Sequence, residues 1–368
     1  MAGRLVLAGA GHAHMTILSR IASIRERGHE VTVIGPSEHH YYSGMGPGML
    51  GGTYTPEQIR FPVKQMTESQ GGKFILDRVV RVDAKTKELL LDSGLTVGFD
   101  VATFNTGSHV PTPIADPGEP DLYTVKPIEN LLHGRKRIQE LAQSDEVAIG
   151  VVGGGPAALE VAGNAWAASL QSGGKGGSIR IYAGRRFLSH LPEGVRDKAL
   201  KVFKQRKITI VEGSYVSRVT GGVVQLEDDR QFRDKVIFLA LGVKPSPLFT
   251  DSGLPTGPDG GLLVNEFLQC MEHPDLFGGG DCIYFQNRPL DKVGVYAVRE
   301  NPILAENVLA RLEGRALTPF DPGGNYLLIF NLGDGKGVFH KSGIVFNGKP
   351  AFWAKDYIDR KFIRKFHP

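Results

Sequence analysis

The stretch VAIGVVGGGPAALEVAGNAWAASL, residues 147–170, decides the fold of this 368-residue chain. Its apolar run VAIGVV is typical of a buried strand, the glycines at 153–155 form a turn, and Leu159 to Leu170 is compatible with a helix. The helix is expected to end in QSGGKGG, residues 171–177, before SIRIYAG, residues 178–184, forms the next strand. The segment is therefore a complete βαβ unit with a nucleotide-binding turn.

A second turn of this kind opens the chain. RLVLAGAGHAH, residues 4–14, combines a short strand with Gly9-Ala10-Gly11; a helix-compatible run and a returning strand, HEVTVIG at 29–35, follow. Gly9 permits the turn, and Gly11 lets backbone amides approach a pyrophosphate at the helix N-terminus. His14 replaces the usual third glycine, and the acid expected after the returning strand is missing, with Glu38 slightly beyond. Taken alone, this turn leaves open an ordinary α/β connection.

The acid expected after the second unit is also missing, because Arg185 and Arg186 follow that strand. Arginine at this place can bind a 2′-phosphate, which favours NADPH over NADH. The alternative is that both side chains are merely solvated in a loop. The residues leave the two interpretations open.

Composition limits the class of protein. With 41% hydrophobic and 22% charged residues, the chain is expected to be globular, and its length predicts two or three domains. Lysine and arginine exceed aspartate and glutamate by only 43 to 39, which gives no reason to expect a nucleic-acid partner. No apolar run approaches the ~20 residues that span a bilayer, and no signal sequence is recognised, so a cytoplasmic location is expected.

Two nucleotide units suit one flavin and one nicotinamide nucleotide between which a hydride passes. VATFNTG at 101–107 and VIFLALG at 236–242 are strands that end in glycine, as chains do where they cross between such domains, and LFGGGDCIYF at 276–285 delivers Asp281. The predicted fold is α/β with two Rossmann-like domains and a C-terminal α+β tail. An FAD domain, residues 1–115 and 246–318, is split around an NAD(P)H domain, 116–245, and residues 319–368 form the tail, with short strands in 326–354.

The motifs GAGHAH, NTG, GGGPAALE, ALG and VNEFLQC…HPDLFGGGDC, in this order, resemble those of the pyridine nucleotide-disulfide oxidoreductases. Among these flavoproteins the chain looks most like type II NADH dehydrogenases, which also carry a double histidine with aromatics, here HHYYSGMGPGMLGG at 39–52. It is still more similar to the NADH-dehydrogenase-like domain fused to selenide, water dikinase, through YSGM, GVYAVR and KDYIDRKF. The resemblance covers essentially the whole chain. It implies an FAD-dependent oxidoreductase that passes electrons from NAD(P)H to a small acceptor such as a quinone.

The resemblance also assigns residues. It places Gly9 and Gly11 on the FAD pyrophosphate, Asp281 near the ribityl-phosphate and the Ser43 to Gly48 segment against the isoalloxazine. Glu160 matches a glutamate near the nicotinamide, although an ordinary first-turn acid that complements the helix dipole would look the same. The residues expected to bind FAD are Gly9, Gly11, His12, Ala13, His14, Glu38, Ser43, Gly44, Met45, Pro47, Thr106, Gly107, Gly280 and Asp281. Those expected to bind NAD(P)H are Gly153, Gly155, Pro156, Ala157, Arg185 and Arg186.

The chain departs from the family pattern in two ways. Cys270 and Cys282 are its only cysteines and do not form a C-x₄-C pair, so a structural role is expected for both. Val295 and Arg299 stand where type II NADH dehydrogenases carry quinone-side glutamines, which leaves the acceptor open. Two alternative functions follow: a sulfide- or selenium-compound:quinone-type oxidoreductase, and a flavin-binding redox-sensing or partner-binding module without appreciable turnover. The histidines have local explanations and no metal site is expected.

The C-terminus, AFWAKDYIDRKFIRKFHP, mixes aromatic and basic residues, which suits an interface with anionic lipid. On a helix, Ile358, Phe362 and Phe366 form one row, and Trp353 and Tyr357 form another on nearly the opposite side. One row is expected to dock on the body. The other is left for the inner face of a membrane, a partner subunit such as a second copy in a homodimer, or a quinone entrance.

Overall fold

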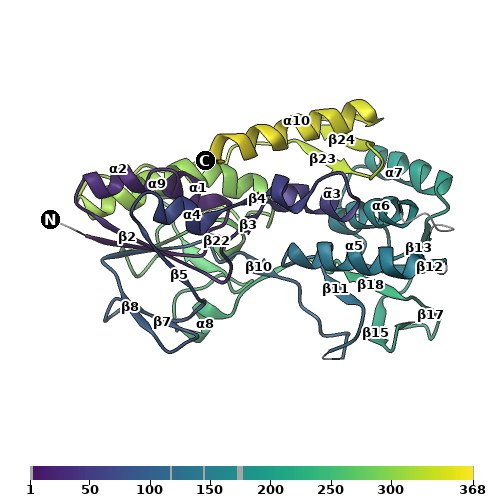
Figure 1. The fold of residues 1–368 in the computed structure, drawn as a ribbon, viewed down its shortest axis with the longest axis horizontal. Helices are drawn as coiled ribbons and strands as arrows, with labels where there is room; N and C mark the ends of the chain where they lie inside the picture. Colours follow the sequence, from purple (N-terminus) through teal and green to yellow (C-terminus); the bar gives the residue numbers. More distant parts are fainter. Residues whose placement is uncertain (1–2, 117, 144–145, 172–176, 368) are drawn as a thin grey trace.

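In a computed structural model, which describes residues 3–116, 118–143, 146–171 and 177–367, the chain forms two lobes, each built on a five-stranded parallel sheet (Figure 1). The first sheet has the order β21-β9-β1-β2-β5 and the second the order β11-β18-β12-β13-β14. The strands of the first are β1 (Arg4–Ala8), β2 (Glu30–Gly35), β5 (Lys73–Leu76), β9 (Val101–Phe104) and β21 (Leu276–Gly278). Those of the second are β11 (Leu122–Thr124), β12 (Val147–Val152), β13 (Gly177–Tyr182), β14 (Thr209–Val211) and β18 (Val236–Leu239). The predicted α/β class with two Rossmann-like units is confirmed.

Apolar runs buried on both faces explain why these segments are central strands. Every residue of β9 and β18 is buried, and β12 is buried at five of its six positions. Helices cover the sheets. They are α1 (Met15–Leu18), α2 (Ile21–Glu26), α3 (Gly46–Leu50), α4 (Val63–Glu68), α5 (Glu129–Ala142), α6 (Pro156–Leu170), α7 (Glu193–Gln205), α8 (Leu248–Asp251), α9 (Gly294–Leu312) and α10 (Lys349–Phe366).

The helix-compatible run after the first turn does form helices, but they are not continuous. The segment instead forms the 3₁₀ turn η1 (His12–His14), then α1, and then α2 after an interruption at Ser19 and Arg20. Ser19 Oγ donates to the carbonyl of Thr16 (3.0 Å), and a side chain that takes a main-chain acceptor competes with the helical ladder.

Smaller sheets complete the lobes. Three have three strands: β6 (Val79–Asp83), β7 (Glu88–Leu91) and β8 (Thr96–Gly98); β15 (Val216–Thr220), β16 (Val223–Leu226) and β17 (Gln231–Arg233); and β23 (Leu328–Asn331), β24 (Gly337–Lys341) and β25 (Ile344–Gly348). Three have two strands: β3 (His40–Tyr41) with β4 (Arg60–Phe61), β20 (Leu262–Val264) with β22 (Ile283–Phe285), and β10 (Ser108–His109) with β19 (Lys244–Pro245). The pair β10 and β19 lies where the chain leaves the first lobe and returns to it, so the two connections between the lobes are hydrogen-bonded to each other.

The tail consists of the sheet β23-β24-β25 and α10, which confirms its predicted α+β character. Helix α10 runs from the second lobe across to the first (Figure 1), where Phe362 packs against His12 of η1 and Phe61 of β4. Phe366 is buried, whereas Ile358, predicted in the same row, is 44% exposed. The docked face instead holds Phe352, Asp359 and Ile363 with Phe366, because spacings of three and four together follow one side of a helix.

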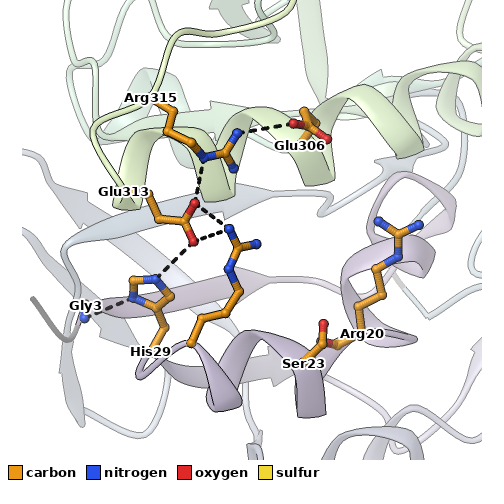
Figure 2. Close-up of polar contacts among 8 residues, drawn as sticks. Gly3, Arg20, Ser23, His29, Glu306, Glu313 and Arg315 are labelled. Carbon is orange, nitrogen blue, oxygen red and sulfur yellow. Dashed lines mark hydrogen bonds and ion pairs between the residues drawn. The ribbon is translucent and has the colours of Figure 1, made fainter.

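Far from the tail, the end of α9 is joined to the start of the first lobe by the ionic network in Figure 2. Glu313 forms ion pairs with Arg27 (2.6 Å) and Arg315 (2.7 Å), and lies 3.7 Å from His29 Nε2. His29 Nδ1 accepts a hydrogen bond from the Gly3 amide (3.2 Å). Over the described ranges, no helix has both the length and the apolar character required to cross a membrane.

Candidate functional site

A cavity of about 580 Å³ lies at the carboxyl ends of the first sheet's strands. Its lining includes residues 34–37 at the end of β2, Gly9 to His12, Asn105 to Gly107, Ser43 and Gly294. Parallel sheets bind ligands at this edge, and the volume is in the range of small-molecule and cofactor sites.

Asn105 shapes the first glycine turn. Gly9 has φ of +83°, and a Cβ there would lie 2.4 Å from the Asn105 carbonyl oxygen, while a Cβ on Gly11 would lie 2.1 Å from Asn105 Oδ1. The Asn105 side chain accepts from the Ala13 amide (3.1 Å) and donates to the Gly279 carbonyl (2.6 Å). It therefore joins η1, the end of β9 and the segment that carries Asp281. Asn105 is the asparagine of the NTG motif, and its role in the turn was not predicted from the sequence.

His14 explains how the turn holds together without a third glycine. Its Nδ1 lies 2.7 Å from the Gly9 carbonyl oxygen and its Nε2 lies 3.0 Å from Thr103 Oγ1. Burial lowers the pKa of His14 to about 4, even though the bond to Gly9 opposes this shift. The neutral imidazole of His14 therefore links the glycine turn to β9 through hydrogen bonds.

Two buried polar atoms beside the cavity have no hydrogen-bond partner among the described residues. They are His12 Nε2 and Thr106 Oγ1, and both residues line the cavity. An unpartnered polar atom that is buried costs free energy unless a ligand or water completes it. The lining therefore fits a bound polar cofactor such as FAD.

Asp281 lies in the 3₁₀ turn η4 (Gly280–Cys282) and forms an ion pair with Lys126. Ser108 Oγ also donates to Asp281 Oδ2 (2.7 Å). Burial alone would raise the pKa of Asp281, but Lys126 and Ser108 outweigh it and lower the pKa. Sequence reasoning missed Lys126, which comes from the segment that enters the second lobe and carries no motif of its own.

Glu300 lies beneath η4. It is 1% exposed and accepts a hydrogen bond from the Gly280 amide (2.5 Å). Burial raises its pKa to about 7, and the nearby charge of Asp281 adds to this effect. A carboxyl group that titrates near neutrality therefore supports the turn that presents Asp281.

The expected FAD residues divide into two groups in the structure. Gly9, Gly11, His12, Ser43, Thr106, Gly107, Gly280 and Asp281 line the cavity. Ala13, His14, Glu38, Gly44, Met45 and Pro47 lie outside the described lining. Glu38 is instead ion-paired with Lys64 (2.7 Å), and both side chains are largely solvent-exposed.

The second glycine turn is open. Gly153 has φ of +140°, and a Cβ there would lie 2.2 Å from the Ala240 carbonyl oxygen, so this glycine is required by the turn itself. A Cβ on Gly155, the N-cap of α6, would meet no described atom within 4 Å. Pro156 and Ala157 are exposed. The helix N-terminus is thus accessible from solvent.

Arg185 and Arg186 are both exposed after β13, on the same edge of the second sheet. Arg186 forms an ion pair with Glu193 (2.7 Å). Arg185 makes no ion pair with any residue that the structure describes. Of the two, Arg185 is the guanidinium that is free for a ligand.

Glu160 faces the C-terminal tail. Its Oε1 accepts a hydrogen bond from the Asn331 amide (2.7 Å). Burial raises the pKa of Glu160, and the positive charge of Lys355 on α10 opposes that shift. The carboxylate therefore connects α6 to both β23 and α10.

Both cysteines are buried and free. Burial raises the pKa of Cys282 to about 11 and also raises the pKa of Cys270. Protonated, enclosed thiols are poor nucleophiles. In the described part of the chain, no group of three or more histidine, cysteine or acidic residues could hold a metal ion.

Known proteins of similar sequence and structure share this architecture. The type II NADH:quinone oxidoreductase of Staphylococcus saprophyticus is 24% identical over 98% of this chain and 95% of its own, and the demethylphylloquinone reductase NdbB of Synechocystis is 24% identical over 96% and 90%. The solved structure of NDH2 from Plasmodium falciparum in complex with NADH superposes with a TM-score of 0.83, at 15% identity, over 100% of this chain and 97% of that one.

The sulfide:quinone oxidoreductase of Aquifex aeolicus superposes with a TM-score of 0.78, at 16% identity, over 99% of this chain and 91% of that one. At such identities these structures establish a common fold. The family model of the pyridine nucleotide-disulphide oxidoreductases matches residues 3–305, which include both glycine turns. The prediction of an FAD-dependent oxidoreductase with NAD(P)H as co-substrate is thereby confirmed. The chain belongs to the pyridine nucleotide-disulphide oxidoreductase family.

Proposed function

We propose that the protein transfers two electrons from NAD(P)H through FAD to a quinone. The observation that carries this proposal is the pairing of a cavity of about 580 Å³ at the first turn with a solvent-exposed turn at the second. A cavity of this size suits a resident cofactor, and an exposed turn suits a substrate that exchanges. The quinone is favoured by two relatives whose names state quinone reduction.

We propose that FAD occupies the cavity, with its pyrophosphate held at Gly9 and Gly11 and its ribityl end at Asp281. When bound, FAD supplies hydride acceptance and electron transfer, and the protein positions the two rings. NAD(P)H would lie at Gly153, Gly155, Pro156, Ala157, Arg185 and Arg186. The corresponding domain limits are 1–115 with 246–318 for FAD, 116–245 for NAD(P)H and 319–368 for the tail.

The test uses the purified full chain reconstituted with FAD. We expect a yellow protein whose flavin absorbance bleaches with NADPH or NADH and returns on addition of a water-soluble benzoquinone. A protein that binds no FAD would overturn the proposal. Reduction without turnover by any quinone would favour the redox-sensing alternative instead.

Oxidation of sulfide or a selenium compound is the competing reaction, and the cysteines decide it. A sulfur relay needs a reactive thiolate, whereas Cys270 and Cys282 are buried with raised pKa values. The double variant Cys270→Ala and Cys282→Ala should keep full NAD(P)H:quinone activity. Loss of activity in a variant that still folds and binds FAD would favour the sulfur reaction.

We also propose that the outer face of α10 contacts an anionic membrane. Trp353 and Tyr357 are 63% and 68% exposed, and Lys361, Arg364 and Lys365 share the exposed side. Ile344 on the adjacent β25 adds a further exposed apolar side chain (64%). Aromatic rings beside basic residues match the boundary between headgroups and acyl chains.

Sedimentation with vesicles tests this contact. The parent should bind vesicles with phosphatidylserine and release them at high salt, while Trp353→Ser with Tyr357→Ser should bind several-fold more weakly. A dimer in solution that the same double substitution dissociates would show that the face is instead an interface between two copies.

A further inference from the structure

Two histidines, the buried His12 and the partly buried His40, meet end to end beside the cavity. His12 Nδ1 lies 3.2 Å from His40 Nε2, and the rings are nearly perpendicular with centroids 4.8 Å apart. His12 follows Gly11 in η1, and His40 belongs to β3. Both line the cavity, and His12 Nε2 is the buried atom that has no hydrogen-bond partner among the described residues.

Aromatic rings enclose the pair. The ring centroids of Tyr42 and Phe362 lie 4.9 Å and 5.8 Å from that of His12, and the centroid of Phe61 lies 6.3 Å from that of His40. Phe362 comes from α10, so the C-terminal helix closes this end of the site. His12 is buried, whereas His40 is partly exposed, so a proton from solvent would enter the pair at His40.

Among the described residues, no carboxylate is paired with either of the two imidazoles. Lys126 and His14 are the nearby basic groups, and Lys126 is itself paired with Asp281. On the α10 side, Tyr42 donates to Asp359 Oδ1 (3.1 Å), and Asp359 Oδ2 lies 3.0 Å from Lys355 Nζ. In the described ranges, no acidic side chain is hydrogen-bonded to either imidazole.

Both rings are neutral at pH 7. Burial, followed by the charge of Lys126, lowers the pKa of His12 to about 3. Burial, His12 and Lys126 lower the pKa of His40 well below its ordinary value. Each ring therefore carries one hydrogen on one of its two nitrogens.

A neutral pair with one shared hydrogen bond has only two arrangements. If His40 Nε2 donates to His12 Nδ1, then His12 Nε2 carries a hydrogen and His40 Nδ1 is bare. If His12 Nδ1 donates instead, His12 Nε2 is bare and His40 Nδ1 carries a hydrogen. The two arrangements differ by one proton moved from one outer nitrogen to the other.

We propose that His12 and His40 form a proton wire that delivers the solvent proton consumed when the acceptor is reduced. The inference rests on the proposed function. In NAD(P)H + H⁺ + quinone → NAD(P)⁺ + quinol, the hydride carries two electrons and one proton, and the second proton comes from solvent. His40 takes that proton at Nδ1 and passes its Nε2 proton to His12 Nδ1. His12 gives its Nε2 proton to the quinone oxygen, after which both tautomers reset.

The first experiment separates proton delivery from electron transfer. His40→Phe keeps an aromatic ring in the cluster and removes both imidazole nitrogens at the start of the wire. His133→Phe, on the exposed side of α5, is the control. Rapid mixing should show flavin reduction by NAD(P)H within about twofold of the parent, since a positioned acid acts only where a proton is transferred. Reoxidation by a water-soluble benzoquinone should slow on the order of 10²-fold.

Ferricyanide provides the matched oxidant, because it takes single electrons and needs no delivered proton. Its rate should be unchanged in His40→Phe. Equal slowing with benzoquinone and ferricyanide, or no slowing with benzoquinone, would overturn the wire. Reoxidation can also be measured on enzyme whose flavin has been reduced by light, without NAD(P)H. A failure of nucleotide binding, which would concern the proposed function, is thereby distinguished from a failure of the wire.

Nuclear magnetic resonance of ¹⁵N-imidazole supplies a readout independent of turnover. In the protein without and with FAD, both rings should remain neutral at pH 6 to 8, and His40→Phe should change the tautomer ratio of His12. A cationic ring at pH 7, or a His12 tautomer ratio that is the same in the parent and in His40→Phe, would overturn the proposal.

Discussion

The two glycine turns follow the same sequence rule but have different surroundings. At the first turn, His12, Ala13 and His14 are all buried, and a Cβ on Gly9 or Gly11 would clash with Asn105. At the second, Pro156 and Ala157 are exposed, and Gly155 has free space around it. The same motif is therefore built once into a protein interior and once into a surface.

This difference indicates which ligand stays and which one exchanges. The first turn is fixed by hydrogen bonds from Asn105 and His14 to segments distant in the chain. The second turn is held through its main chain, where Gly153 packs against Ala240 just after the neighbouring strand and donates a hydrogen bond to the Tyr182 carbonyl. A tightly connected turn preorganises a site for a permanent cofactor, while an open one lets a co-substrate come and go.

The largest expected effect comes from matched alanine substitutions in the two turns. Gly9→Ala should destabilise the protein by about 2–5 kcal/mol, because a positive φ and a close contact with Asn105 are both violated. Gly155→Ala should change stability by less than about 0.5 kcal/mol and mainly weaken NAD(P)H binding. Urea unfolding with bound-flavin absorbance checks both. Similar losses of stability would end the distinction between the turns.

The next largest effect is expected from Glu300, the buried carboxyl group that lies beneath η4. Glu300 has a pKa raised to about 7, so its contribution to stability is present below the unfolded value of 4.5 and is lost as pH rises through 7. Glu300→Gln keeps an acceptor for the Gly280 amide and removes this titration. Between pH 4.5 and 8 the parent should lose on the order of 2–3 kcal/mol relative to the variant. Parallel pH profiles of unfolding free energy would contradict the burial of an ionisable carboxyl group there.

A smaller effect tests the openness of the second site. Arg185→Ala should weaken NADPH binding about tenfold, because one charge-assisted hydrogen bond to the 2′-phosphate is lost, and should leave NADH unchanged. Arg186→Ala should do less, since Glu193 already engages that guanidinium. Rates of flavin reduction with each nucleotide measure both. Equal rates for NADH and NADPH in the parent and in both variants would remove the NADPH preference.

The fold could be predicted because its central strands are apolar runs that end at glycine turns, as in 147–155 and 4–11. The site could be predicted only in part. Asn105 reaches Ala13 across 92 residues and Lys126 reaches Asp281 across 155, and such pairs depend on topology rather than local spacing. Which face of α10 docks could not be predicted for a related reason: the sequence around Ile358 does not show where β23 and β24 pack against α10.

The smallest effect is expected far from both turns, in the network around Glu313 (Figure 2). Glu313→Gln weakens the ion pairs with Arg27 and Arg315, whose side chains are 46% and 42% exposed, so solvent screens them. We expect a loss of about 0.5 kcal/mol at low salt that disappears in 1 M salt, with no change in flavin reduction. Thermal unfolding at the two salt concentrations measures it. A loss that persists in high salt, or an altered flavin, would mean that the first turn depends on the whole lobe and not on its own contacts with Asn105 and His14.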